Sequence, residues 1–140
     1  MTNAQDKYTQ ISKKQDIYSD FLLNFTPHPF THDLARVKNE DAVKRSIRNI
    51  ILTNAFEVPY KPMLGGNINR FLFEPIDVLT QRSIQESIEL TIKNHEPRAR
   101  LIHCIVTPDE INQKYDVMIV FNVVNNPNQV EMVLELYRIR

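Results

Sequence analysis

The sequence predicts one α+β domain, an antiparallel sheet of three to five strands with two main helices packed on one face. Two stretches in the first two thirds of the chain space their apolar residues as amphipathic helices do, and three alternating apolar stretches fill the last third. Short turn signals separate those three stretches, which is typical of an antiparallel meander. A chain of 140 residues with 42% hydrophobic content is long enough for one core and too short for two.

The N-terminal part of the chain contains two weak strand signals. Residues 1–16 are polar and lack helical or strand periodicity, so we expect a flexible arm ahead of a single domain at 17–140. Residues 17–25 alternate partly and run into a proline-rich loop, which predicts a short strand. Residues 34–37 indicate a second short strand.

The first predicted helix begins at Asn39, a residue type favoured at the N-cap, and ends near Asn54. Glu40 and Asp41 follow the cap, where the positive end of the helix dipole favours acids. Four aliphatic residues recur at spacings that keep one face apolar, which predicts the core face. They are Val43, Ile47, Ile50 and Ile51.

The connection between the two helices is rich in proline and glycine. Residues 57–66 hold both glycines of the chain and two prolines, which predicts a shaped loop. Residues 68–73 then supply enough apolar side chains for a short helical turn, which Pro75 ends.

The second long helix is predicted to begin between Asp77 and Thr80 and to end at His95. Its apolar stripe consists of residues at helical spacing. They are Ile84, Ile88, Thr91, Ile92 and His95.

Three strands are predicted after the second helix. Residues 99–107 are apolar on both alternating sets, which is typical of a central strand. Residues 115–123 and 130–136 alternate, and turns at 109–114 and 125–128 separate the three runs. We expect the last strand to be an exposed edge, which invites pairing with another chain.

Glu96, Pro97 and Arg98 stand where the second helix must stop. Proline biases the preceding residue away from the helical region, so Glu96 is expected to be extended and to point to the same side as Arg98. This small charged clamp is able to close on itself, to cap the helix, or to grip another chain through the planar guanidinium. The local residues alone leave these three uses open.

The overall composition argues against several kinds of function. Seventeen basic and seventeen acidic residues give a formal net charge of zero, so no broad field favours nucleic acid or an anionic membrane. No signal peptide or membrane-spanning stretch is visible, and assembly in a cytoplasm is expected. The single cysteine, Cys104, lies in an apolar run and is interpreted as a core residue.

No cofactor or metal site is predicted. His28 and His32 have a zinc-like spacing, but Pro29 lies between them. Gly65-Gly66 precedes a helical turn without the lysine of a phosphate-binding loop, which favours a tight bend.

Paired carboxyl groups that could serve a glycosidase were also considered. No motif beside any of them would raise a pKa, and no nucleophile motif occurs, so we expect no catalytic residues and no enzyme activity. The candidates are Glu57, Glu74, Asp77 and Glu96.

Several separated motifs, in order, resemble one known family. The run from Glu86 to Arg98 resembles the signature of the small baseplate wedge protein of contractile-tailed, T-even-like phages, a family shared with a type VI secretion baseplate subunit. The Pro59-to-Gly65 loop followed by Ile68 resembles the shaped loop of that family, and 72–74 resembles its Leu-Phe-Glu. Arg45-Ser46-Ile47 and the Asn125-Asn126-Pro127 turn also fall in register. The resemblance covers about residues 43–137, and the role of the first 40 residues stays open.

The resemblance implies a structural protein of the tail baseplate. In that family the Glu-Pro-Arg triplet contacts the helical core bundle of the neighbouring wedge proteins, which implies a partner-binding role for Glu96, Pro97 and Arg98. The sheet of the family is similar to a domain of the tail sheath subunit, which implies that sheath strands add to it. The implied arrangement is a six-fold array through the baseplate, with no self-oligomer, nucleic acid or membrane as partner.

Three hypotheses follow: a phage baseplate wedge protein that starts sheath assembly, a type VI secretion subunit or other adaptor of the same fold, and a lysozyme-type hydrolase. The third is kept because some family members are labelled lysozyme-like.

Overall fold

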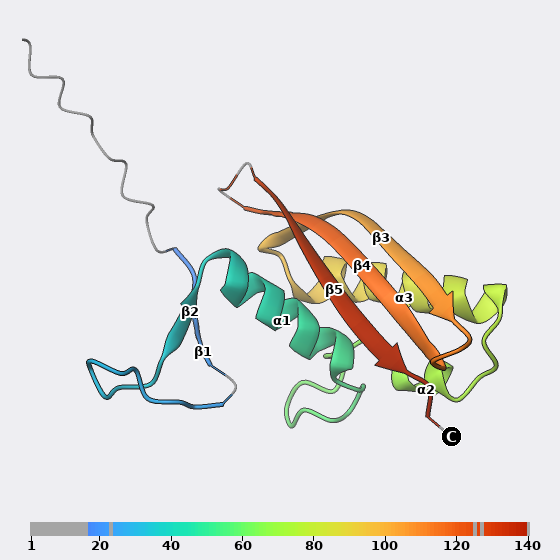
Figure 1. The fold of residues 1–140 in the computed structure, drawn as a ribbon, viewed down its shortest axis with the longest axis horizontal. Coiled ribbons are helices and arrows are strands. Elements are labelled where there is room, and N and C mark those ends of the chain that lie inside the picture. The colour runs from blue at the N-terminus through green and yellow to red at the C-terminus, as the bar shows by residue number, and fades with distance from the viewer. Residues whose placement is uncertain (1–16, 23, 125, 127, 140) are drawn as a thin grey trace, which may run out of the picture.

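The computed structural model describes residues 17–139 apart from 23, 125 and 127, so the predicted arm at 1–16 lies outside the described residues. Two helices and a short helical turn combine with two small antiparallel sheets (Figure 1). In chain order the elements are β1 (Ser19–Phe21), β2 (Arg36–Lys38), α1 (Glu40–Leu52), α2 (Asn69–Leu72), α3 (Val78–His95), β3 (Ala99–Asp109), β4 (Lys114–Val123) and β5 (Gln129–Tyr137).

The larger sheet and the two long helices enclose the core. Its strand order is β3-β4-β5 with both pairs antiparallel, and Figure 1 shows α3 running behind it. Most of the apolar stripes of α1 and α3 and one face of the sheet belong to a single buried cluster, which confirms the predicted α+β fold. Ile50 and His95, which were predicted for these stripes, are only partly buried and lie outside the cluster. Tyr115 and Phe121 of the central strand are its largest members and are fully buried.

The prediction that the 99–107 stretch forms the central strand is wrong. β4 lies in the middle, and β3 is an edge strand. The register of β3 against β4 shifts by one residue between Leu101 and His103, so Ile102 sits in a β-bulge. Before the bulge Leu101 faces the core, and after it Cys104 does, which leaves Ile102 and Ile105 exposed. The bulge therefore explains why both alternating sets of this stretch are apolar although one face is open.

The two short N-terminal strands do not join the larger sheet. β1 and β2 form a separate two-stranded hairpin with Phe21 opposite Arg36, and each strand is shorter than the predicted one. Figure 1 shows this hairpin projecting from the end of the molecule at which α1 begins.

Asn39 precedes α1 but does not cap it as predicted. Its side chain makes no capping hydrogen bond, and its Oδ1 accepts the amides of Ile17 (2.9 Å) and Tyr18 (3.3 Å). The Asn39 amide in turn donates to the carbonyl of Tyr18 at 2.8 Å. Asn39 therefore fastens the base of the hairpin to the start of α1.

α3 begins and ends as predicted. The Asp77 carboxylate accepts the amide of Thr80 at 2.6 Å, a side-chain N-cap. The helix ends at His95, and Glu96 has a non-helical ψ of 76° because Pro97 follows it.

The loop between α1 and α2 passes close to α1. Gly65 has a φ of 116°, and a β-carbon there would lie 2.3 Å from the carbonyl oxygen of Thr53. Only glycine fits so close to another part of the backbone, so the structure accounts for Gly65 and no bound phosphate is needed to explain it.

Among the described residues, no helix is long and apolar enough to cross a bilayer.

Candidate partner-binding site

Glu96 and Arg98 form a two-point ion pair at the C-terminal end of α3. Arg98 donates from Nε to Glu96 Oε1 (2.6 Å) and from Nη2 to Oε2 (2.8 Å). The Glu96 side chain is 2% exposed and that of Arg98 35% exposed, so the carboxylate is buried and the guanidinium reaches the surface. The fork geometry is the strongest form of an arginine–carboxylate pair.

The backbone around the pair is also held. The Glu96 amide donates to Ile92, the Ala99 amide donates to Glu96, and the carbonyl of Arg98 accepts the Val124 amide at 2.9 Å. Pro97 lies exposed between the two charged residues. The triplet is therefore a rigid corner that joins the end of α3 to the start of β3.

The electrostatics of the pair favour both charged forms. Burial opposes ionisation of Glu96, but hydrogen bonds from Arg98 and Ser46 and the charge of Arg98 outweigh it and lower the pKa of Glu96. The hydrogen bond to Glu96 likewise raises the pKa of Arg98. The carboxylate thus stays charged at neutral pH and holds the guanidinium in one orientation.

Two residues that support the triplet were not singled out from the sequence for this role. Ser46 of α1 supplies a hydrogen bond to Glu96, and the guanidinium of Arg98 lies 5.5 Å from the ring centre of Tyr18. Ser46 follows the buried Ala42 by one helical turn and so lies on the inner face of α1. A polar residue on that face is the sequence feature that could have indicated a buried hydrogen-bond partner. For Tyr18 no sequence pattern existed, because its contact depends on how the hairpin folds back.

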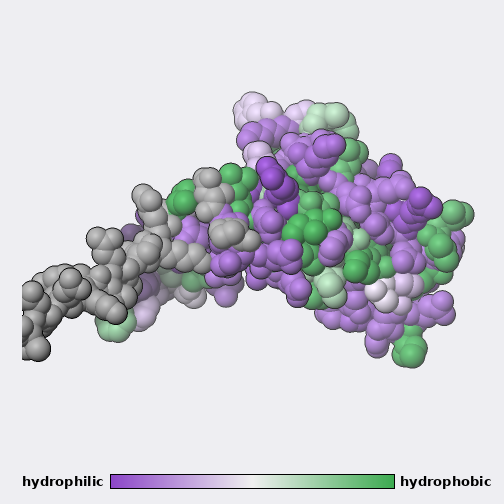
Figure 2. All heavy atoms as spheres, turned by 90° about the horizontal axis from the view of Figure 1, so that it is seen from above, coloured by the Kyte–Doolittle hydropathy of each residue, from purple (hydrophilic) through white to green (hydrophobic). Residues whose placement is uncertain are grey.

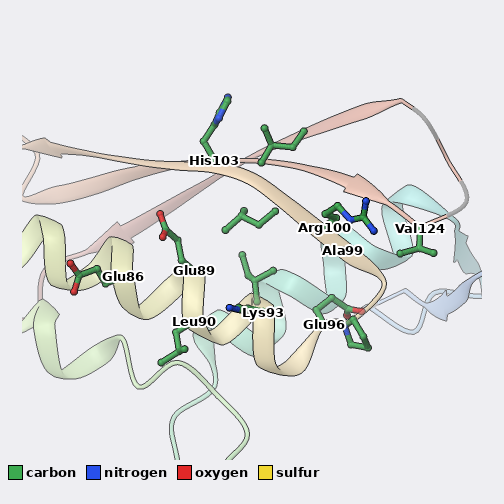
Figure 3. Close-up of a pocket in the computed structure, with 13 residues that line it drawn as sticks. Glu86, Glu89, Leu90, Lys93, Glu96, Ala99, Arg100, His103 and Val124 are labelled. Atoms are coloured by element: carbon green, nitrogen blue, oxygen red, sulfur yellow. The ribbon is translucent and has the colours of Figure 1, made fainter.

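A groove of about 730 Å3 opens between α3 and the free side of β3, next to the triplet. Glu86, Glu89 and Leu90 line it from the helix, and Leu101 and Ile102 from the strand. In Figure 3 the Glu89 side chain points from α3 toward the β3 ribbon, whereas His103 points away from the helix. The groove therefore offers apolar walls beside an unpaired strand edge and acidic groups at its helix side.

The carboxyl groups considered as catalytic candidates each have a local structural role. Asp77 caps α3, Glu57 accepts the Asn54 amide at 2.7 Å, and Glu96 pairs with Arg98. Glu74 lies 3.4 Å from the hydroxyl of Thr80. The pKa of Asp77 is lowered, chiefly by the Thr80 amide, and that of Glu96 is lowered too, the opposite of what a general acid needs.

The other chemical candidates have structural explanations as well. Burial raises the pKa of the Cys104 thiol to about 12, so it is an unreactive core residue. His28 and His32 lie in the exposed loop of the hairpin, where the His32 amide donates to the carbonyl of His28. Within the part of the chain that the structure describes, no group of three metal-ligating side chains comes together.

These observations define a class: a small α+β protein with a rigid charged corner and a sheet whose outer strands are open to other chains. Comparison with known proteins then identifies the family. The chain belongs to the family of baseplate wedge protein gp25, whose sequence model matches residues 37–128. It is similar to baseplate wedge protein gp25 of Enterobacteria phage T4, with 30% identity over 101 residues that cover 72% of this chain and 76% of the relative.

Solved structures share the fold. A protein from Geobacter sulfurreducens proposed to be a tail lysozyme superimposes with a TM-score of 0.67 at 24% identity, covering 72% of this chain and 92% of that one. A chain of the six-fold symmetrised anti-feeding prophage baseplate superimposes with a TM-score of 0.61 at 22% identity, covering 88% of this chain and 87% of that one. The predicted resemblance to the baseplate wedge family is confirmed.

Proposed function

We propose that this protein is a rigid adaptor that joins the wedge proteins of a phage baseplate to the first ring of the tail sheath. The observation that carries the proposal is the preformed corner at Glu96, Pro97 and Arg98, placed beside an open sheet edge in a chain of the gp25 family. Six copies are held in the array by the baseplate and not by contacts with each other. Assembly takes place in the host cytoplasm.

The corner is the proposed contact with the helical core bundle of the neighbouring wedge proteins. Glu96 is buried against Arg98, so the groups presented to a partner are the ring of Pro97 and the outer part of the guanidinium. Nη1 of Arg98 is not part of the fork. A guanidinium already fixed by a carboxylate loses little side-chain entropy on binding, which favours a tight contact.

The test of this contact must separate binding from folding. Arg98→Ala would leave a buried carboxylate without its main partner and destabilise the fold by about 1–3 kcal/mol. The double change Glu96→Leu with Arg98→Met replaces the pair by apolar side chains of similar size, which often costs little. We expect this variant to keep its thermal stability to within a few degrees and to lose binding to purified wedge proteins; unchanged binding would contradict the proposed contact.

The second proposed contact is the addition of a sheath strand to the sheet. Two helices side by side span about 20 Å, whereas three strands span about 14 Å, so the helix layer is wider than the sheet by about one strand. The groove between α3 and β3 lies where this excess occurs. A fourth strand there would cover it, so the groove favours β3 over the β5 edge that the sequence indicated.

A charge placed in the groove tests this contact. Ile102→Lys puts an ammonium at the bulge, and we expect normal wedge binding but no sheath ring. Ile111→Lys is the matched control, because Ile111 is exposed in the turn between β3 and β4. Circular dichroism of both variants must match the unmodified protein, and normal sheath assembly by Ile102→Lys would exclude the β3 edge.

A type VI secretion subunit or related adaptor is the second candidate, favoured by the likeness to the anti-feeding prophage baseplate chain. Tail genes beside this gene would support the phage assignment, and secretion genes would support the alternative.

A further inference from the structure

The hairpin formed by β1, β2 and the loop between them exposes three phenylalanine side chains among its described residues. Phe25 and Phe30 are 66% and 87% exposed, and Phe21 and Ile17 are about half exposed. A two-stranded hairpin is marginally stable by itself. Aromatic rings that face solvent do not stabilise such a hairpin. Their exposure therefore indicates a contact with another chain.

The two sides of the hairpin differ in character. Tyr18, Asp20 and Val37 are half-buried toward the body of the protein, and the charge of Asp20 acts on Arg98. On the exposed side, the guanidinium of Arg36 stacks 5.2 Å from the ring centre of Phe21. The exposed side therefore combines apolar rings with a cation.

The carboxylates of Asp20 and Asp33 accept hydrogen bonds from neighbouring backbone amides of the hairpin. Asp20 accepts the amide of Phe21 at 2.8 Å, and Asp33 accepts the amide of Leu34 at 2.7 Å. Arg45 of α1 donates to the carbonyl of Phe21, which adds a second cation beside the strand. This arrangement is complementary to an apolar surface bordered by carboxylates.

The hairpin is continuous with the corner that carries the triplet. Tyr18, at the base of β1, lies under the guanidinium of Arg98, and Arg98 is fixed by Glu96. Asn39 fastens the same base to α1 through hydrogen bonds to Ile17 and Tyr18. A partner seated on Pro97 and Arg98 would meet the hairpin next.

The comparison structures add an independent observation. The anti-feeding prophage baseplate chain covers 88% of this chain, more than residues 39–140 alone could supply, so its fold extends into the hairpin region. The sequence match to the family begins only at residue 37. The structural match to that baseplate chain therefore reaches into residues ahead of α1, most of which lie outside the family match.

We infer that the exposed side of the hairpin is a second docking surface for the same wedge neighbour that the triplet contacts, and that it binds an apolar patch bordered by carboxylates. The inference rests on the proposed function of the triplet. The aromatic rings supply the buried contact area, and Arg36 supplies the charge that orients the partner.

The test uses substitutions that leave the fold undisturbed. Phe25 has a φ of 47°, which asparagine tolerates better than phenylalanine, so Phe25→Asn removes the ring without adding backbone strain. Phe56→Asn is a matched control, because Phe56 is 78% exposed with a φ of 66° in the loop after α1. Arg36→Glu is matched by Arg82→Glu on the exposed side of α3.

The measurement is the Kd for the wedge proteins of the same tail, co-expressed and purified as a complex. We expect Phe25→Asn with Arg36→Glu to weaken binding by at least about tenfold, and Phe56→Asn with Arg82→Glu to bind as the unmodified protein does. Binding by the hairpin variant within about twofold of the unmodified protein would overturn the inference.

The triplet variant distinguishes failure of the hairpin inference from failure of the proposed triplet contact. If Glu96→Leu with Arg98→Met loses binding while the hairpin variant keeps it, the hairpin inference alone fails. If the hairpin variant loses binding while the triplet variant keeps it, the hairpin contact stands and the proposed role of the triplet fails. A hairpin variant that binds the wedge normally but fails to assemble sheath would assign the hairpin to another partner and overturn the inference.

Discussion

At the scale of single residues, the Glu96–Arg98 pair shows one of the uses that the sequence left open. It closes on itself through a two-point ion pair, and it leaves the outer part of the guanidinium at the surface. In the proposed contact, the buried carboxylate would act on a partner only through Arg98. Removing either residue alone changes stability as well as shape, which is why a matched double substitution is needed to measure binding.

The lowered pKa of Glu96 predicts a specific loss of stability in acid. A carboxyl group whose folded pKa lies below its unfolded value contributes stability at higher pH, and this contribution is lost as the pH falls through the folded value. For Glu96 the loss begins near the ordinary value of 4.5 and continues below it. We expect Glu96→Gln to be less stable at neutral pH and to lose less stability on acidification.

The measurement is urea unfolding of both proteins at several values between about pH 6 and about pH 3. Asp77, Asp109 and Glu135 also have lowered pKa values, so the difference between the two proteins is the informative quantity. Parallel stability curves for the two proteins would show that Glu96 is not the group that titrates.

At the scale of elements, the helices were predictable and the edges of the sheets were not. The stripes of α1 and α3 have clear helical spacing, and Asp77 and Pro97 mark the two ends of α3, so the bounds of α3 follow from the sequence. Pro75 follows α2, and α1 ends at Leu52 without a proline. The residues of the β3 stretch do not predict the position of the bulge at Ile102, because that position depends on how β3 pairs with β4. The same holds for the site: Glu96, Pro97 and Arg98 were predicted, whereas Ser46 and Tyr18 reach them only through tertiary structure.

Asn39 provides a prediction about how the hairpin is attached. Asn39→Ala removes the oxygen that accepts two backbone amides and places alanine at a φ of 51°, so we expect a cost of about 1–3 kcal/mol. The loss should concentrate in the hairpin. Amide hydrogen exchange is expected to speed up in β1 and β2 while the protection of α3 is kept.

Asp77→Ala is the control for Asn39, because it removes a true helix cap. It should cost about 1 kcal/mol and leave exchange in the hairpin unchanged. Unchanged hairpin exchange in Asn39→Ala would mean that other contacts fasten β1.

At the scale of the whole molecule, two of the proposed contact surfaces adjoin each other and the third is formed by other elements. The corner and the groove are both built from α3 and β3, and Glu96 and Pro97 line the groove, whereas the hairpin is built from β1 and β2. Figure 2 shows separate hydrophobic patches among hydrophilic residues on the face seen from above. α3 passes directly into β3 through the corner, whereas longer connections at residues 22–35 and 53–68 join β1 to β2 and α1 to α2. This direct junction would suit the proposed adaptor, because a displacement of the partner at the corner would be passed to the sheet.

The final prediction concerns hydrolysis, because one structural neighbour is proposed to be a tail lysozyme. Glu86 and Glu89 come nearest to a carboxylate pair in a groove, but Arg82 pairs with Glu86 at 3.3 Å and Gln85 donates to Glu89 at 3.0 Å. A glycosidase of the usual kind places two carboxyl groups on either side of the bond that it cleaves, whereas these two side chains are each engaged by a neighbour on α3. We therefore expect the purified protein to release no soluble fragments from peptidoglycan under conditions in which a lysozyme does. Robust release that disappears in Glu86→Gln or Glu89→Gln would show that the groove is catalytic and that the adaptor interpretation is incomplete.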